Sequence, residues 1–342
     1  MDDIARIAGV SASTVSRALS DSPLVAERTK NRIREIADRF EYQVDPRARS
    51  LALRKTDVIG VIAPQEFDNR LWDPFFSELL GAVAGSVMAC GYQMLLARVS
   101  SLQEISAKAL TAPGRVDGAI IMGQEKKHLA IDALSRRGDP IIVWGQKNPG
   151  QHYRTVGCDN VQGGYEAGLH LLDCGYRHIA FLGETAFPEV AARLEGLRRA
   201  FEARKADASK IVVQPSPFLS DVGYERAADL LQKNRSIDAI FAASDVLAIG
   251  AMSAATALGR RVPEDLGVVG FDDIQMAQYC QPALTTVRQD VRVAGRTLVD
   301  KLLDMISGEE ITSAILPVEL IVRESTRKRS RTARKKSSKR KG

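Results

Sequence analysis

The sequence predicts a small all-α N-terminal domain followed by an α/β body built on two doubly wound parallel sheets. Three observations support this fold class. Apolar residues recur at helical spacing through the first 40 residues. From Asp57 on, apolar runs of four to six residues, the length of buried parallel strands, alternate with helical segments as in βαβ units. The body of about 270 residues is too long for one such sheet and suits two.

The N-terminal domain contains three predicted helices. A helical run of apolar residues up to Ala8 is broken at Gly9. Ser11 is expected to cap a second helix, about residues 12–19, by accepting a hydrogen bond from a backbone N–H. A third helical run extends over Thr29–Phe40. Two short helices joined by a glycine-containing turn and packed on a third are typical of a helix-turn-helix, although any small three-helix bundle would give the same pattern.

The second helix exposes short side chains and a single arginine, so it can approach DNA base edges closely. Arg17 has the donors needed to read guanine O6 and N7. Ser13, Thr14 and Ser16 can bind phosphates and fix the register of the helix on the duplex.

The segment Asp3–Leu19, DIARIAGVSASTVSRAL, resembles the N-terminal domain of the lactose/galactose repressor (LacI/GalR) family of bacterial transcription regulators. The resemblance implies that residues 1–42 bind DNA and that Ala12, Ser13 and Arg17 lie at base-reading positions. Ala26 replaces the serine that often caps the third helix in the family, so we expect a slightly frayed helix end.

Residues 43–55 form the predicted linker between the two domains. Asp45-Pro46 is an N-cap followed by the favoured proline, but the helix after it is too short to stay folded alone. The family resemblance implies a hinge helix that orders on operator DNA. Ala48 and Leu51 match the positions that enter the minor groove, where Leu51 would act as an apolar wedge that bends the duplex. A basic linker without this role is the alternative.

Eight short apolar runs predict the strands of the body. They are Val58–Ala63, Gln93–Ala97, Gly118–Met122, Ile141–Trp144, Ile179–Leu182, Ile211–Val213, Ala239–Ala242 and Val268–Phe271. No strand is followed by a dinucleotide-binding glycine motif, and neither a phosphate-binding loop nor a serine nucleophile elbow occurs. The four histidines lack metal-ligand spacing. We therefore expect no enzyme activity, no cofactor and no metal site.

The family resemblance continues through the body and covers nearly all of residues 2–326. The segments that carry it are Asp73–Phe76, Thr155–Gly164, Gly175–Gly183, Ala243–Ala251, Val262–Asp273, Pro282–Asp290 and Arg323–Thr326. It implies a two-lobed, periplasmic-binding-protein-like domain at residues 56–326 that binds an effector and dimerises. Lobe 1 is expected at about 56–156 and 288–315, and lobe 2 at about 157–287 and 316–326.

The resemblance also implies a set of effector contacts. Residue by residue, they fall on Asp73, Phe75, Arg193, Phe218, Ser244, Asp272 and Gln289. A sugar fits this set, because Arg, Asp and Gln supply donors and acceptors for adjacent hydroxyls. The two phenylalanines would cover its apolar face, or else pack in the core.

Three further residues bear on the cleft. Gly145 stands where some relatives carry an effector-binding carboxylate, so the ligand set differs from theirs, and Trp144 beside it is a possible lining residue. Asp272 and Asp273 could pass for paired carboxylates. Because adjacent residues after a strand usually point apart, we expect one cleft carboxylate and not an acid–base pair.

Charge is concentrated at the two ends of the chain. Residues 327–342 hold ten Lys or Arg and no acid, residues 1–55 carry a net +3, and the whole chain carries +6, so residues 56–326 carry −7. An acidic body does not suit a protein that wraps nucleic acid over its whole surface, but basic ends suit one that touches phosphate locally. The tail at 327–342 is too polar to pack and is expected to be disordered, as a solvated charge run or a nonspecific DNA arm.

Composition excludes several protein classes. No apolar run reaches the roughly 18 residues of a membrane span, and the N-terminus lacks the features of a secretory signal, so a cytoplasmic protein is expected. The four cysteines lie far apart and suggest buried free thiols. The tail has no Leu and therefore lacks the leucine heptad that makes tetramers of some relatives, so we expect a homodimer.

The sequence thus predicts a dimeric transcriptional regulator that binds a pseudo-palindromic operator. It is expected to repress a carbohydrate-utilisation operon under the control of a small sugar bound between the lobes. Two alternatives remain at this stage: a cytoplasmic sugar-binding or sugar-metabolising protein whose head binds another protein, and a periplasmic transport receptor with the same body fold.

Overall fold

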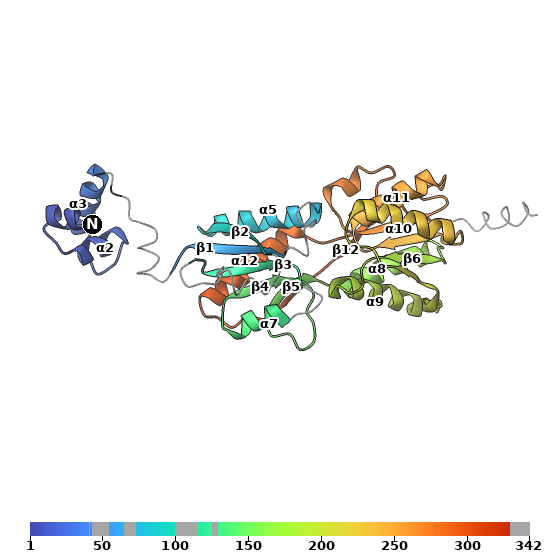
Figure 1. Ribbon diagram of the computed structural model, residues 1–342, viewed down its shortest axis with the longest axis horizontal. Coiled ribbons are helices and arrows are strands. Elements are labelled where there is room, and N and C mark those ends of the chain that lie inside the picture. The colour runs from blue at the N-terminus through green and yellow to red at the C-terminus, as the bar shows by residue number, and fades with distance from the viewer. Residues whose placement is uncertain (41, 43–54, 65–72, 100–114, 125–128, 329–342) are drawn as a thin grey trace, which may run out of the picture. The chain divides into compact units, whose positions relative to one another are not determined.

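The chain divides into two compact units, Met1–Thr56 and Asp57–Gly342 (Figure 1). The computed structural model describes residues 1–40, 42, 55–64, 73–99, 115–124 and 129–328. The predicted minor-groove residues Ala48 and Leu51 and the basic tail beyond Lys328 lie outside the described residues.

The N-terminal unit is a three-helix domain, as predicted. Its helices are α1 Asp2–Ala8, α2 Ala12–Leu19 and α3 Glu27–Arg39. Their apolar faces meet in one small core that includes Ile4, Val15 and Ile33. Because α2 buries Val15 and Ala18 on one side, its opposite side remains exposed.

Two local features fix the turn between the first two helices. Gly9 ends α1 with a φ of 64°, a left-handed conformation that favours glycine. The Ser11 hydroxyl accepts a hydrogen bond from Thr14 N at 3.2 Å and caps α2, as expected. Ala26, at the start of α3, provides no side-chain cap.

Lobe 1 of the body contains a six-stranded parallel sheet with the strand order β11-β5-β4-β3-β1-β2. Its strands are β1 Val58–Pro64, β2 Gln93–Val99, β3 Gly118–Met122, β4 Ile141–Trp144, β5 Arg154–Cys158 and β11 Ala314–Leu316.

Lobe 2 contains a second six-stranded sheet with the order β12-β10-β9-β8-β6-β7, which is parallel except for β12. Its strands are β6 Ile179–Leu182, β7 Val212–Gln214, β8 Ala239–Ala242, β9 Gly267–Asp272, β10 Thr285–Arg288 and β12 Glu319–Ile321. The two sheets and the helical N-terminal unit confirm the predicted fold class.

Four strands, β5, β10, β11 and β12, were not predicted. Strands β11 and β12 lie at sheet edges and contain three residues each. Strand β10 begins with two buried threonines, and their polar groups are satisfied by distant residues: Thr286 Oγ1 donates to Asp245 Oδ1 at 2.5 Å, and Thr285 N donates to Ser325 Oγ at 2.8 Å. Hydropathy therefore does not reveal that this strand is buried.

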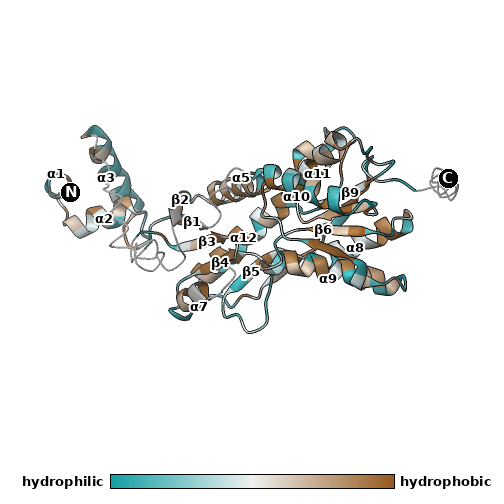
Figure 2. Ribbon diagram, turned by 45° about the vertical axis from the view of Figure 1, so that its right-hand side comes forward, coloured by the Kyte–Doolittle hydropathy of each residue, from teal (hydrophilic) through white to brown (hydrophobic). Residues whose placement is uncertain are grey.

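Helices cover both faces of each sheet. They are α5 Pro74–Ala89, α7 Leu129–Arg136 and α12 Val291–Ile306 in lobe 1, and α8 Asn160–Asp173, α9 Pro188–Ala203, α10 Ser220–Lys233 and α11 Asp245–Ala257 in lobe 2. Two 3-10 turns, Ala208–Lys210 and Gln275–Gln278, complete the described elements. Figure 1 shows the pairs α8/α9 and α10/α11 on opposite faces of the lobe 2 sheet. Figure 2 shows that hydrophobic residues are concentrated on the strands between the helices.

The chain passes between the sheets three times. It leaves the lobe 1 sheet after Cys158, returns after Arg288, and crosses again between Leu316 and Glu319. The sequence had placed these crossings at about 156/157, 287/288 and 315/316. The first two crossings matter most for function, because they carry Asn160 and Gln289 into the pocket described below.

Two expectations about composition can be compared with the described residues. None of the described helices is long and apolar enough to cross a membrane. All four cysteines are free, but the prediction that they are buried is wrong for Cys90, which is exposed at the C-terminal end of α5. Cys280 is half-buried.

Candidate effector pocket and DNA-contacting helix

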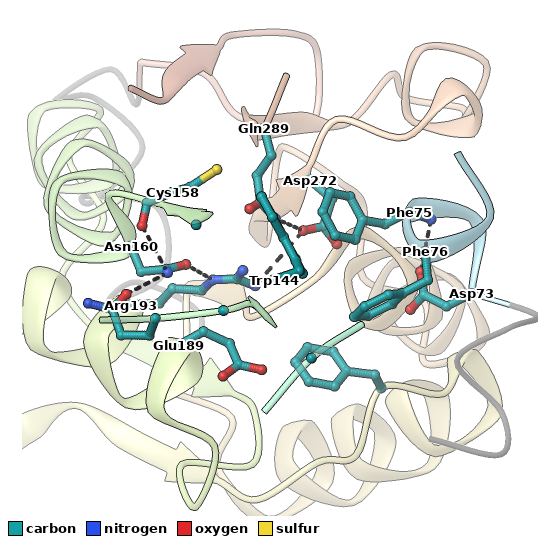
Figure 3. A pocket seen from close by; sticks show the side chains of 15 residues that line it. Asp73, Phe75, Phe76, Trp144, Cys158, Asn160, Glu189, Arg193, Asp272 and Gln289 are labelled. Atoms are coloured by element: carbon teal, nitrogen blue, oxygen red, sulfur yellow. Dashed lines mark hydrogen bonds and ion pairs between the residues drawn. The ribbon is translucent and has the colours of Figure 1, made fainter. Parts of the chain in front are cut away.

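A pocket lies in the body and is lined by elements of the two lobes (Figure 3). Six of the seven predicted effector contacts line it: Asp73, Phe75, Arg193, Phe218, Asp272 and Gln289. The structure places Ser244 elsewhere, since this residue is not part of the lining and its hydroxyl caps α11 by accepting from Leu247 N.

Arg193, on α9, is buried and tightly held. Its Nε donates to Asn160 Oδ1 at 2.8 Å, and its Nη1 donates to the carbonyl oxygen of Ala243. The guanidinium group stacks on the Phe271 ring at 3.7 Å from the ring centre and lies 3.9 Å from Asp272 Oδ1. Burial lowers the pKa of Arg193, and the nearby Asp272 opposes this shift. The arginine is therefore positioned before any ligand arrives.

Asp272 is the last residue of β9 and is buried beside Arg193. Gln289 Nε2 donates to Asp272 Oδ1 at 2.6 Å, so residues from two successive strand ends hold one carboxyl group. Burial raises the pKa of Asp272 well above its usual range, while Arg193 opposes the shift. Its backbone φ of 118° lies in a region that residues other than glycine rarely adopt.

Asp273 also has a positive φ, of 56°, but its carboxylate is engaged in other ion pairs. Its Oδ2 accepts from Arg288 Nε at 2.7 Å, and its Oδ1 accepts from Arg323 Nη2 at 2.6 Å. Of the adjacent acids, only Asp272 lines the pocket. The adjacent pair Asp272–Asp273 therefore provides one cleft carboxyl group and not an acid–base pair.

Lobe 1 contributes mainly aromatic side chains. The rings of Phe75 and Trp144 lie 5.9 Å apart, and those of Phe75 and Phe76 lie 5.4 Å apart at nearly a right angle. Asp73 caps α5 by accepting from Phe75 N at 2.9 Å, which fixes the start of the helix that carries both phenylalanines. These rings can cover the apolar C–H face of a sugar ring.

Gly145 lines the pocket next to Trp144, and the space beside it is filled by Gln124. A Cβ at position 145 would lie only 2.5 Å from the Gln124 side chain. The amide of Gln124 is itself fixed, because its Nε2 donates to Gln146 O at 2.7 Å and to Tyr153 Oη at 2.9 Å. A carboxylate at position 145 is thus incompatible with this arrangement of Gln124.

Five of the seven predicted DNA-contacting residues lie on α2, and the other two, Ala48 and Leu51, lie outside the described residues. Ser13, Ser16 and Arg17 are exposed, whereas Ala12 and Thr14 are partly buried. The hydroxyls of Ser13 and Thr14 each lie 2.8 Å from Ser11 Oγ, so the first turn of the helix is held by a small hydroxyl cluster. The exposed face of α2 is narrow and free of large side chains, apart from Arg17.

Comparisons with known proteins agree with this arrangement. Residues 1–45 match the model of bacterial regulatory proteins of the lacI family, and residues 169–326 match a periplasmic binding protein-like domain. The transcriptional regulator CelR of Thermobifida fusca is 30% identical over 331 residues, covering 95% of this chain and 97% of CelR. The chain belongs to the LacI family.

Solved structures of this family have the same fold. A CelR–cellobiose complex matches with a TM-score of 0.72 and 29% identity, over 94% of this chain and 98% of that one. The lac repressor dimer bound to operator and the anti-inducer ONPF matches with a TM-score of 0.82 and 26% identity, over 95% and 98% of the two chains. This LacI-family chain is a transcriptional regulator.

The pocket of this LacI-family regulator also contains residues that were not predicted. They include Phe76, Gln146, Cys158, Asn160 and Glu189. Asn160 links two walls, because its Oδ1 accepts from Arg193 and its Nδ2 donates to Gln146 Oε1 at 2.8 Å. The position of Asn160 at a helix start could have indicated this residue from the sequence. No sequence feature indicates Glu189, since an acid in the first turn of a helix is common on protein surfaces. Burial raises the pKa of the Cys158 thiol to about 12, which disfavours the thiolate form.

Proposed function

We propose that this regulator represses a carbohydrate-utilisation operon, binding a pseudo-palindromic operator as a homodimer and responding to a sugar in the pocket. The observation that carries the proposal is that Arg193, Asp272 and Gln289 line the same pocket as Phe75, Phe76 and Trp144. Directional hydrogen-bonding groups together with aromatic rings suit a molecule with hydroxyl edges and an apolar face. The cellobiose complex of CelR and the operator complex of the lac repressor dimer support it.

We propose that the N-terminal unit binds DNA and that the body binds the sugar. In the head, Ala12, Ser13 and Arg17 read base edges, while Thr14 and Ser16 contact phosphates. Ala48 and Leu51 enter the minor groove. In the body, the pocket binds the sugar without transforming it, as expected of a chain whose relatives are transcriptional regulators. A regulator of chromosomal DNA acts in the cytoplasm.

The direct test is operator binding with and without sugar. The full chain should shift a small set of genomic fragments in a gel, and one sugar of a panel should change that affinity. An effector changes the DNA-binding equilibrium only by its differential affinity for the two states. A chain that binds no fragment specifically, or whose binding no sugar changes, would contradict the proposal.

Arg17→Ala tests the recognition helix. We expect a loss of about 1–3 kcal/mol per base contact on operator DNA, with relaxed specificity at one base in each half-site. Arg6→Ala is the matched control, because Arg6 is an exposed arginine on α1 that pairs with Asp3. Equal weakening on operator and random DNA would show that Arg17 contacts phosphate and not a base.

Asp272→Asn tests the pocket. The amide retains side-chain size and, like aspartate, asparagine tolerates positive φ, but it cannot act as a carboxylate acceptor for two sugar hydroxyls. We expect operator affinity close to that of the parent and an effector requirement at least roughly tenfold higher, since hydrogen bonds to charged groups contribute about 1.5–3 kcal/mol. A parent-like effector response measured by fluorescence anisotropy would contradict the assigned role of Asp272.

A further inference from the structure

We propose that Glu78 joins the two lobes around the pocket and thereby sets its affinity for the sugar. Glu78 lies in α5 of lobe 1. Its Oε1 accepts a hydrogen bond from the backbone N–H of Gln275 in lobe 2 at 3.3 Å, although the two residues are 197 positions apart in the chain. Glu78 is not among the residues that line the pocket, so it acts as a positioning residue and does not contact the ligand. The inference rests on the proposed function, because it concerns the binding of that sugar.

Glu78 is one helical turn away from the aromatic wall of the pocket. Phe75 and Phe76 lie in the first turn of α5 and line the pocket. Residues three positions apart are neighbours on the surface of a helix, so Glu78 projects from the same side of α5 as Phe75. Asp73 fixes the start of this helix, because its Oδ1 accepts from Phe75 N at 2.9 Å. A bond to Glu78 therefore also holds the two rings in place.

Gln275 follows the turn that presents the carboxyl group of the pocket. Asp272 ends β9, and the backbone φ is positive at both Asp272 and Asp273, with values of 118° and 56°. Residues other than glycine rarely adopt such values, so the surrounding structure has to hold the turn. Ile274 is extended again, with a φ of −60° and a ψ of 155°, and the 3-10 turn Gln275–Gln278 begins after it. The position of Asp272 therefore depends on how this segment is anchored.

Two carboxylates from different lobes anchor the segment. Asp245, buried at the start of α11 in lobe 2, accepts from Ile274 N through its Oδ2 at 2.9 Å. Glu78 in lobe 1 accepts from the next backbone N–H, that of Gln275. Ile274, which precedes the 3-10 turn, provides no side-chain cap of its own. Consecutive N–H groups are thus bonded to both lobes, and the Gln275 bond links this segment to the helix that carries the aromatic wall.

This link lowers the cost of holding the two walls at one separation. A sugar that contacts Phe75 and Asp272 together needs both lobes in one arrangement, and its apparent affinity falls with the fraction of molecules in that arrangement. The bond between Glu78 and Gln275 stabilises the arrangement in which it forms. Glu78 is half-buried and Gln275 is exposed, so the bond has the modest strength of a typical hydrogen bond, which changes an equilibrium by about two- to tenfold. Breaking it should weaken sugar binding by a factor of this size.

The test measures sugar affinity in the full chain after either partner of the bond is removed. Thermal shift with glucose, galactose, ribose and cellobiose selects the sugar, and calorimetry gives its dissociation constant. Glu78→Ala removes the acceptor. Gln275→Pro removes the N–H donor, and proline suits the first residue of a 3-10 turn that follows an extended residue. We expect each variant to bind the sugar at least about threefold more weakly than the parent. Parent-like affinity in Glu78→Ala would overturn the proposal.

Two further variants separate the link from a general effect of the substitution. Glu78→Gln keeps a side-chain oxygen that can accept from Gln275, so it should retain an affinity within about twofold of the parent. Glu166→Ala is the matched control, because Glu166 is also half-buried but accepts its bond, from Gln162 Nε2 at 3.0 Å, within the single helix α8. It should bind the sugar like the parent. Equal losses in Glu166→Ala and Glu78→Ala would contradict a role of Glu78 in joining the lobes.

Operator binding gives a second readout, because a sugar changes operator affinity only through its differential affinity for the two states. In Glu78→Ala the sugar concentration that gives half of the change in operator affinity should rise at least about threefold. Saturating sugar should still produce the full parental change. A response that stays incomplete at saturation would place Glu78 in the transmission to the head and overturn its assignment to sugar affinity.

The double variant tests whether the two groups act through the same bond. Glu78→Ala combined with Gln275→Pro should bind the sugar no more weakly than the weaker single variant, since the second change removes nothing further. Losses that multiply would show that Glu78 and Gln275 act independently and would refute the link. Failure of all four sugars to bind the parent would instead contradict the proposed sugar effector itself, and this inference with it.

Discussion

The two lobes of the body are built on the same strand order, yet they present different chemistry to the pocket. In each lobe the last strand in chain order lies at one sheet edge, and the other five strands follow it across the sheet in the same relative order; only the edge strand β12 runs antiparallel. Lobe 1 presents Phe75, Phe76 and Trp144, whereas lobe 2 presents Arg193 and Asp272. The shared scaffold therefore fixes where the strand ends lie, and the residues at those ends decide the chemistry.

The polar wall of lobe 2 is supported by very close helix packing. A Cβ on Gly164 of α8 would lie 2.0 Å from the carbonyl oxygen of Arg193 on α9. The backbone that carries Arg193 is thus pressed directly against α8, and the side chain is then fixed by Asn160 at the start of α8. We infer that lobe 2 determines the orientation of a ligand, while lobe 1 limits its shape.

Removing Arg193 should have the largest effect of the variants that test this comparison. Arg193→Ala leaves Asp272, Asn160 and the Ala243 carbonyl without their shared donor, and breaking a buried pair of this kind costs about 3–5 kcal/mol. The measurement is urea unfolding at fixed protomer concentration. Arg199→Ala, an exposed arginine on the same helix, should change the unfolding free energy by less than about 0.5 kcal/mol. Equal losses in the two variants would show that lobe 2 is not organised around Arg193.

A pair of glycine substitutions tests the packing difference. Gly164→Ala should lower the unfolding free energy by about 1–3 kcal/mol, because the added methyl group has no space between α8 and α9. Gly81→Ala, in α5 of lobe 1, meets no atom within 4 Å and should raise it by about 0.5–1 kcal/mol, the helix preference of Ala over Gly. Urea midpoints of both variants provide the measurement. The same sign of effect in both would remove the proposed difference between the lobes.

The sequence predicted the central strands better than the edges. The predicted bounds of β3, β4, β6 and β8 match the structure residue for residue, because strands buried on both faces are uninterrupted apolar runs. Strand β10 was not predicted because its buried threonines depend on partners such as Ser325, which lies 40 residues away in the chain. Local pattern carries no information on such distant partners.

The same limit applies to the pocket. The contacts taken from the family resemblance fall on strand ends and helix starts whose positions the fold determines, and six of the seven lie around one cavity. Glu189 and Asn160 were not predicted, since they enter the pocket only through the packing of α8 against α9. Ser244 is adjacent to Ala243, whose carbonyl contacts Arg193, but its own hydroxyl is used to cap a helix.

The last prediction is a pH dependence located in lobe 2. Asp245 is buried at the start of α11, where its Oδ1 accepts from Thr286 Oγ1 at 2.5 Å and its Oδ2 from Ile274 N at 2.9 Å. Burial raises the pKa of Asp245 to about 8, although these two hydrogen bonds oppose the shift. An unfolded aspartate has a pKa of about 3.9, so between about pH 4 and pH 8 the folded chain retains a proton that the unfolded chain has lost. The contribution of Asp245 to the free energy of unfolding therefore falls as the pH rises through this window, by at most about 1.4 kcal/mol per pH unit, and levels off above it.

Asp245→Asn should remove this contribution, because asparagine cannot ionise, and the stability of the variant relative to the parent should increase steadily from about pH 5 to pH 8. Burial also raises the pKa of Asp272, and the charge of Asp245 raises it further, so Asp245→Asn also alters the contribution of Asp272 and the difference between the two proteins reports on both acids together. Asp229→Asn, an exposed residue of α10 paired with Lys233, is the control and should keep the slope of the parent. Urea unfolding at several pH values gives the comparison. Parallel curves for the parent and Asp245→Asn would mean that Asp245 is ionised in the folded chain, and that the buried acids of lobe 2 are stabilised well enough to remain charged.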